Sequence, residues 1–147
     1  MKRAQRGMTL VELIYSIGLS LVVMAVGYGA YASFARADDV ERQREQLNLT
    51  AQNAMGRIKE DVRSASAIAA SGSTMALSMA GDRVEYRNLP RGSGVERRAR
   101  HGRCLFKAVS ATFSRSGGGV NVSVKARAKT HGRAIRVDLT SFIVPRA

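Results

Sequence analysis

The chain has 147 residues, with 24 Lys and Arg against 11 Asp and Glu, and a formal net charge of +13. This length allows one small domain with an appended segment, and the single cysteine excludes an intrachain disulfide. The positive charge favours acidic partners such as nucleic acid, anionic lipid or an acidic protein face, although it can also serve only solubility. His101 and His131 have no acidic neighbour at ligand spacing, so we expect no metal and no cofactor.

The first predicted element is a helix that spans a membrane. A short basic leader precedes it, and the chain from Leu13 to Phe34 is apolar and free of charge. This segment would form about 33 Å of helix, which matches a hydrocarbon core of roughly 30 Å. Basic residues beside a span stay in the cytoplasm, so the leader predicts an exported C-terminal domain; its basic residues are Lys2, Arg3 and Arg6. A cleaved signal peptide, cut within residues 30–37, is the alternative, but its apolar region would be only about 7–15 residues long.

Glu12 is the one charge between the leader and Phe34. A carboxylate at the centre of a membrane helix costs about 2.5–3.5 kcal/mol and usually has a partner. A Glu at the membrane edge that reaches water with its carboxylate is the simpler alternative, but it accounts for neither the leader nor the spacing.

The stretch from Gly7 through Met8 to Glu12 and Leu13, behind a basic leader, resembles the prepilin signature of the type IV pilin and type II secretion pseudopilin superfamily. The resemblance implies cleavage between Gly7 and Met8 by a prepilin peptidase, and N-methylation of Met8. It also implies that Glu12 pairs with the N-terminus of a neighbouring subunit; pairing within the same chain stays open. Gly7 lets a protease approach the backbone closely, and the new amine, cationic near neutral pH, needs a counter-charge in an apolar bundle.

Residues 35–70 predict an amphipathic continuation of the helix. Its apolar residues recur at steps of three and four, which defines a single stripe: Leu47, Ala51, Ala54, Met55, Ile58, Val62, Ala65 and Ile68. We expect this stripe to pack on the chain's own sheet rather than on a partner helix. Gly27 and Gly29 allow the helix to bend.

Residues 71–147 predict an exported β-sheet domain. Its strand-like segments are residues 74–79, 83–87, 95–100, 105–113, 120–127 and 133–144, with a glycine-rich hairpin turn at 114–119 and an edge strand at 95–100. The predicted fold is α+β, with a long N-terminal helix packed on an antiparallel sheet of four to six strands, as in pilins. The predicted regions are a leader (1–7), an assembly helix (8–34), its continuation (35–70) and the sheet domain (71–147).

Two looser motifs resemble J-type minor pseudopilins and W-type minor pilins: Arg-x-x-x-Asp-x-Arg from Arg57 to Arg63, and Val84-Glu85-Tyr86. An arginine-rich segment follows them. A solvated loop is its simplest interpretation, and contact with DNA, lipid or an acidic neighbouring subunit is the alternative; its residues are Arg91, Arg97, Arg98, Arg100 and Arg103. After Glu96 the only acidic residue is Asp138, so the calcium cluster of major pseudopilins is not expected.

The sequence therefore predicts a minor pilin or pseudopilin of a secretion pseudopilus or type IV pilus, anchored in the inner membrane with its N-terminus cytoplasmic. Its expected partners are the prepilin peptidase, other pilin subunits and the inner-membrane assembly platform. We expect no enzymatic activity, because no nucleophile with a nearby base is recognisable. The alternative is a subunit of a DNA-uptake pilus that grips nucleic acid through the arginine-rich segment.

Overall fold

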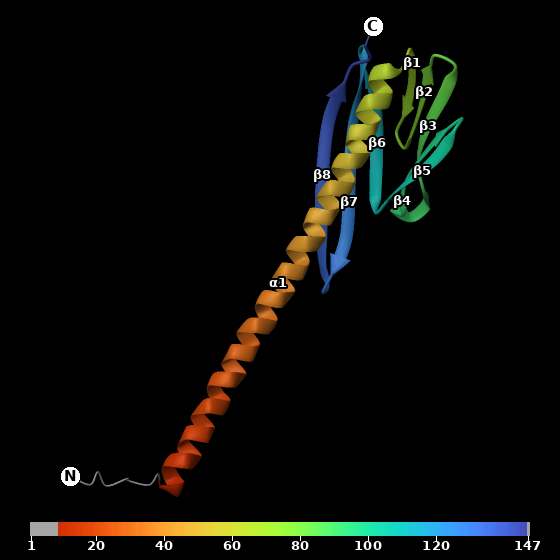
Figure 1. Ribbon diagram of the computed structural model, residues 1–147. Coiled ribbons are helices and arrows are strands. Elements are labelled where there is room, and N and C mark those ends of the chain that lie inside the picture. Colours follow the sequence, from red (N-terminus) through yellow and green to blue (C-terminus); the bar gives the residue numbers. More distant parts are fainter. Residues whose placement is uncertain (1–8, 147) are drawn as a thin grey trace, which may run out of the picture. The chain divides into compact units, whose positions relative to one another are not determined.

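The computed structural model describes residues 9–146 and, of Arg91, the backbone alone. The chain forms two compact units, which divide between Asp39 and Val40. The described part of the first unit is the N-terminal half of the helix α1 (Leu10–Ser64); the second unit holds its C-terminal half and eight strands (Figure 1). The fold is therefore α+β, as the sequence predicts. The predicted leader, residues 1–7, and Met8 lie outside the described residues.

Helix α1 is continuous because nothing in its sequence interrupts the hydrogen-bond ladder. The two prolines of the chain, Pro90 and Pro145, lie well beyond it. Gly27 and Gly29 do not break it, so the bend that they allow does not appear as an interruption in the helix. The predicted amphipathic stripe is confirmed in the second unit, where its side chains are buried: Leu47, Ala51, Ala54, Met55, Ile58 and Val62.

The helix ends earlier than the sequence predicts. It stops at Ser64, and residues expected to continue it form strand β1 (Ala67–Ser71). Within β1, Ile68 and Ala70 pack against the core while their neighbours are exposed, which is the alternation of a strand. A three-residue step from Ala65 to Ile68 fits a helical stripe equally well, so periodicity could not reveal the change of structure.

The strands form two antiparallel sheets in place of the single sheet expected. The first has the order β1-β2-β3-β4-β5, where the new strands are β2 (Thr74–Met79), β3 (Asp82–Asn88), β4 (Gly94–Ala99) and β5 (Gly102–Lys107). The second has the order β6-β7-β8, with β6 (Val109–Ser116), β7 (Gly119–Thr130) and β8 (Arg133–Ile143). A short 3₁₀ helix, η1 (Pro90–Gly92), connects β3 to β4. Contrary to the prediction for residues 95–100, β4 is internal and β5 forms the edge.

The predicted strand at residues 105–113 is wrong as a single element, because Ala108 divides it between the two sheets. Ala108 has a φ of 59°, a conformation that is costly for a residue with a side chain. Two backbone hydrogen bonds hold it there. Its N–H donates to the carbonyl of Ser93 at 3.2 Å, and its carbonyl accepts from the N–H of Arg127 at 3.0 Å. This residue therefore passes the chain from the first sheet to the second.

The glycine-rich turn between β6 and β7 is confirmed, but it is shorter than the predicted residues 114–119, because residues 114–116 belong to β6 and Gly119 belongs to β7. Gly117 supplies a φ of 54° at the turn. Gly119 instead lies under the last strand, where a Cβ would come within 2.6 Å of the Ile143 carbonyl oxygen and 2.7 Å of the Phe142 ring. A larger residue at 119 would push β8 away from β7.

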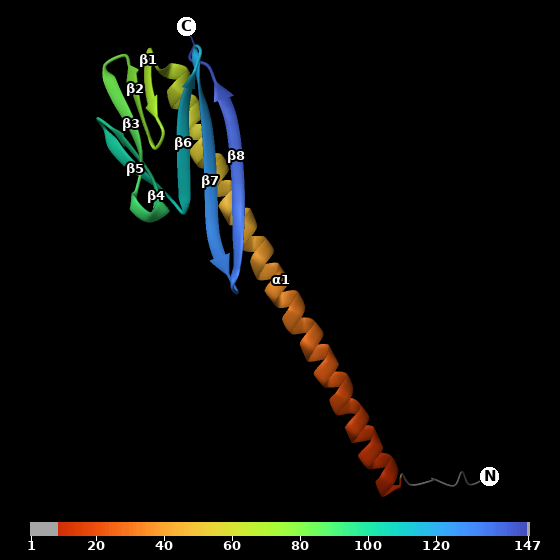
Figure 2. The same cartoon turned by 180° about the vertical axis from the view of Figure 1, so that it is seen from behind.

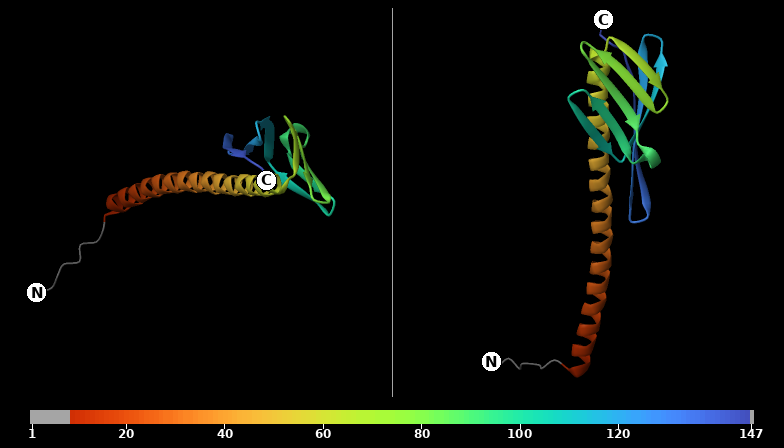
Figure 3. Two further views of the ribbon diagram at one scale, coloured as in Figure 1. Left: turned by 90° about the horizontal axis from the view of Figure 1, so that it is seen from above. Right: turned by 90° about the vertical axis from the view of Figure 1, so that its right-hand side faces the viewer.

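Within the second unit, the helical segment after Val40 lies on one face of the β6-β7-β8 sheet, as Figures 1 and 2 show from opposite sides. Valines and alanines of β7 alternate toward this face and are buried: Val120, Val122, Val124 and Ala126. The five-stranded sheet lies beside β6 (Figure 3) and adds Met75, Leu77, Val84, Tyr86 and Val95 to the same core. The helix segment and the two sheets thus share one core.

Side chains and backbone join the two sheets where β3 and β1 meet β6. The Asn88 side chain donates from Nδ2 to the carbonyl of Ala111 at 2.6 Å, and its Oδ1 accepts from the Ala111 N–H at 2.9 Å. The N–H of Phe113 donates to the carbonyl of Gly72 at 2.8 Å. The Asn88 side chain thereby forms the two hydrogen bonds with Ala111 of β6 that a neighbouring strand would otherwise supply.

Candidate functional site

The start of α1 is built around Thr9 and Glu12. The N–H of Thr9 donates to Oε2 of Glu12 at 2.9 Å, and the N–H of Glu12 donates to the Thr9 hydroxyl oxygen at 3.3 Å. The Thr9 hydroxyl also donates to Oε2 at 3.0 Å. This reciprocal arrangement is a capping box, which satisfies backbone N–H groups that a helix start leaves without partners. The carboxylate also lies at the positive end of the helix dipole.

The capping box gives Glu12 a local partner that the sequence analysis missed. The signal was present as Thr-x-x-Glu immediately before an apolar run. Glu12 is therefore not an unpaired carboxylate inside an apolar segment: it belongs to the first turn and is held beside the amide that follows Met8. Gly7, Met8 and the basic residues of the leader (Lys2, Arg3 and Arg6) lie outside the described residues.

After Glu12, the helix of the first unit exposes large apolar side chains on every face. Leu13 and Phe34 are 47% and 74% exposed. Its serine hydroxyls are satisfied within the helix: Ser16, Ser20 and Ser33 donate to carbonyls four residues earlier, at 2.8, 2.7 and 3.0 Å. Internal satisfaction of polar groups is what an apolar solvent demands. By length and by a mean hydropathy of 2.1, α1 contains a segment that could span a membrane.

The four arginines of the arginine-rich segment whose side chains the structure describes do not form one surface. Arg97 turns inward to Asp61 of α1: its Nε lies 2.6 Å from Oδ2 and its Nη2 lies 3.1 Å from Oδ1. The Tyr86 hydroxyl donates to the same Oδ2 at 2.6 Å. Asp61 is 6% exposed, so this cluster of Asp61, Tyr86 and Arg97 is a buried link between α1, β3 and β4.

The electrostatics of this cluster favour a neutral phenol beside a charged pair. Burial raises the pKa of the Tyr86 hydroxyl far above its usual value, and the hydrogen bond to Asp61 raises it further. The hydrogen bond to Asp61 also raises the pKa of Arg97, so its guanidinium stays charged. Asp61 and Tyr86 belong to the two loose motifs read from the sequence, and the structure brings them together. In this arrangement the Arg97 guanidinium neutralises the Asp61 carboxylate and no side chain is placed as a nucleophile. We therefore infer that the cluster stabilises the fold.

Arg98 and Arg103 are occupied by a second buried acid, Glu96, on the opposite face of β4. Oε2 of Glu96 lies 3.1 Å from Nη2 of Arg98, and its Oε1 pairs with Nε of Arg103. The Glu96 side chain is 2% exposed, whereas those of Arg98 and Arg103 are 58% and 64% exposed. The two arginines therefore cover the carboxylate and keep an outward surface.

Arg100 lies in the turn between β4 and β5 with an exposed side chain, and its N–H donates to Oδ1 of Asp82 at 3.2 Å. The side chain of Arg91 lies outside the described part of the structure. Of the four arginines whose side chains the structure describes, Arg98, Arg100 and Arg103 are open to an acidic partner. Contact with such a partner stays a prediction for these three.

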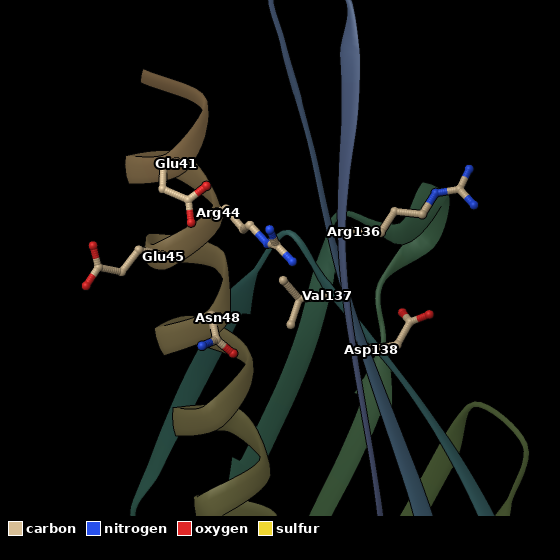
Figure 4. A pocket seen from close by; sticks show the side chains of 7 residues that line it. All are labelled: Glu41, Arg44, Glu45, Asn48, Arg136, Val137 and Asp138. Carbon is tan, nitrogen blue, oxygen red and sulfur yellow. The ribbon is translucent and has the colours of Figure 1, made fainter. Parts of the chain in front are cut away.

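A groove of ≈ 460 Å³ lies between α1 and β8 in the second unit (Figure 4). Arg44 and Val137 point into it, whereas Arg136 and Asp138 point away from the helix. Six of its seven lining residues are polar or charged, and Val137 is the one apolar residue among them. Small-molecule sites are mostly apolar with a few convergent polar groups, and this groove lacks that character. Across residues 9–146, no group of three His, Cys, Asp or Glu side chains is placed to hold a metal ion.

No protein-family model, curated protein or solved structure matches this chain. The comparison with the pilin superfamily therefore depends on the sequence and structure of this chain alone. A long N-terminal helix with an apolar segment, packed through its C-terminal half on antiparallel sheet, is compatible with a pilin-like fold. The apolar segment and the capping box at its start are the features from which a function can be argued.

Proposed function

We propose that this chain is a filament subunit of the type IV pilin and pseudopilin superfamily, of the minor kind. In this proposal a prepilin peptidase cuts between Gly7 and Met8, and the subunit stays in the inner membrane by its N-terminal helix, with the second unit exported. It acts by assembly with sister subunits on an assembly platform and not by catalysis.

The observation that carries the proposal is the position of the Glu12 carboxylate at the start of an exposed apolar helix. Both hydrogen bonds from Thr9 end on Oε2, which leaves Oε1 to accept from an ammonium group. Cleavage after Gly7 would create such a group at Met8. In an apolar bundle of helices, opposite charges are tolerated as pairs, so each Glu12 would need one amine.

The DNA-uptake alternative draws less support from the structure. This alternative requires the arginine-rich segment to bind DNA phosphates, but Arg97 is buried against Asp61. Arg98 and Arg103 are paired with Glu96, which cancels part of their charge. A duplex facing this segment would meet fewer available guanidinium groups than the sequence suggests.

One experiment distinguishes the effects of cleavage after Gly7, of helix capping by Thr9 and Glu12, and of the negative charge on Glu12. The full chain is expressed with a prepilin peptidase and a pseudopilus assembly system, and the N-terminal peptide mass and the subunit content of sheared filaments are measured. Gly7→Val should leave the precursor at full length. Glu12→Gln should be cut normally but be absent from filaments, because Gln also closes a capping box but carries no charge.

Thr9→Val is the matched control. It removes the hydroxyl of the cap, at a cost of about 0.5–2 kcal/mol to the helix start, and keeps the carboxylate. We expect this variant in filaments at a reduced level. Normal shortening of Gly7→Val would contradict the cleavage site, and normal incorporation of Glu12→Gln would show that the charge has no role in assembly.

A further inference from the structure

The β7–β8 hairpin carries a concentration of positive charge that neither the fold nor the proposed function uses. Residues 125–136, which we name the basic hairpin, contain five cations and no acid: Lys125, Arg127, Lys129, Arg133 and Arg136. Strand β6 pairs with β7 only as far as Ala126, opposite Val109. Beyond Arg127, whose N–H still donates to the Ala108 carbonyl, the hairpin is a two-stranded ribbon in which β7 pairs with β8.

The ribbon places like charges on one face. Arg127 lies directly opposite Arg136, and Lys129 is two residues further along the same face of β7. All three side chains are exposed, and none forms an ion pair with a residue in the described range. Like charges directly opposite each other destabilise a sheet unless an anion lies between them. The other face of the ribbon is anchored to the core by Ile135.

The basic hairpin lies at the end of the second unit where the chain enters from the apolar segment. Its strand β8 borders the groove that the first turns of this unit also line, through Glu41 and Arg44 (Figure 4). Only residues 35–39 separate Phe34 from Val40. Even fully extended, this link reaches about 20 Å, so Val40 is tethered within that length of chain from Phe34.

We propose that the basic hairpin binds the phosphate groups of anionic phospholipids in the bilayer that holds the N-terminal helix. Basic residues near an anionic membrane surface bind with a gain of roughly five-fold each, and the attraction falls off within a Debye length of about 10 Å at 0.1 M salt. Nucleic acid presents similar phosphates. A tether this short, however, gives lipid headgroups the higher effective concentration. The inference rests on the membrane anchoring proposed above.

The test uses the full chain in lipid nanodiscs, either of phosphatidylcholine alone or with about one third phosphatidylglycerol. A fluorophore is attached in a Cys104→Ser, Ala134→Cys background, since Ala134 is an exposed position on the cationic face. Lipids with a quencher on the headgroup report how close the hairpin lies to the surface. We expect stronger quenching in anionic discs, and its loss in 0.5 M salt.

Two charge-matched variants locate the effect. Substituting Gln for Arg127, Lys129, Arg133 and Arg136 should abolish the difference between anionic and neutral discs, since Arg127, Lys129 and Arg136 on the cationic face are together worth more than about a hundred-fold in affinity. Substituting Gln for four exposed cations elsewhere should preserve the difference; these are Arg83, Arg87, Lys107 and Arg115. Equal quenching in both discs, or equal loss in both variants, would overturn the proposal.

Two further readouts separate the competing explanations. If a short DNA duplex binds the labelled hairpin in neutral discs more tightly than the anionic discs do, nucleic acid and not lipid is the ligand, and the proposal is wrong. Failure of the chain to co-elute with either disc would contradict the membrane anchoring itself. That result is distinct from a chain that inserts but shows no response to anionic lipid.

Discussion

Replacing Arg97 by Met tests the buried cluster of Asp61, Tyr86 and Arg97 most directly. The substitution keeps an apolar side chain of similar length but removes both guanidinium contacts to Asp61, at 2.6 and 3.1 Å. Asp61 then stays 6% exposed with the Tyr86 hydroxyl as its remaining partner in the cluster. Breaking a buried ion pair from one side costs about 3–5 kcal/mol, because an uncompensated charge is left inside.

A loss of this size would remove a large part of the stability of the second unit, because small domains unfold with roughly 5–15 kcal/mol. Asp61→Leu should cost a similar amount, since it leaves the Arg97 guanidinium uncompensated. The triple variant Asp61→Leu, Tyr86→Phe and Arg97→Met removes every charge and hydroxyl of the cluster together. It should recover most of the loss, because well-packed apolar groups replace buried pairs at little or no cost.

The measurement is urea unfolding of the full chain in detergent micelles, with the strand signal followed by circular dichroism. Micelles keep the apolar helix of the first unit in solution, and the strands report the second unit alone. The comparison requires equal slopes of free energy against urea in all variants. Single substitutions that each cost less than about 1 kcal/mol, or a triple variant as unstable as the single ones, would refute this account of the cluster.

Two further outcomes follow from contacts described above. Asn88→Ala should destabilise the second unit by about 2 kcal/mol or more, because it leaves both the N–H and the carbonyl of the buried Ala111 without their partner. Asn88→Asp should cost at least as much in the same urea assay, because a carboxylate oxygen would then face the Ala111 carbonyl oxygen in place of the amide donor. Tyr86 should make the free energy of unfolding depend on pH in the alkaline range, because burial raises the pKa of its hydroxyl in the folded state. Its contribution to stability is complete below the pKa of about 10 in the unfolded chain, and it declines above that pH by up to about 1.4 kcal/mol per pH unit. Tyr86→Phe should lose this particular decline, which a pH series of melts of both proteins measures.

The elements of the fold with a clear period could be predicted from the sequence. The apolar stripe of α1 gave the buried face of its second half, and alternating valines gave β7. Strand β2 has the predicted bounds, because the turns on both sides carry small and polar residues. These signals are local, and they depend on burial of one face at a time.

What could not be predicted depends on contacts between distant residues. Ala108 looks like any residue in a strand, and its positive φ is stabilised by Ser93 and Arg127 from other parts of the chain. Arg97 looked like one more solvent-facing arginine, and only the fold brings it to Asp61. One sequence signal was nevertheless available: Asp61 follows Ile58 at a core-facing step of the helix, where an acid requires a buried cation.

Because Glu12 closes a capping box, its presence alone does not indicate assembly with a partner. A Glu three residues after a Thr stabilises the start of any helix, so its presence here does not require assembly with a partner. Assignment as a filament subunit therefore also needs the features around Glu12: a basic leader ending in Gly7, and an exposed apolar segment from Leu13 to Phe34. Capping needs only an acceptor at position 12, whereas pairing with an amine in an apolar bundle needs a negative charge. Comparing Gln with Glu at this position isolates that difference, because Gln keeps the acceptor and removes the charge.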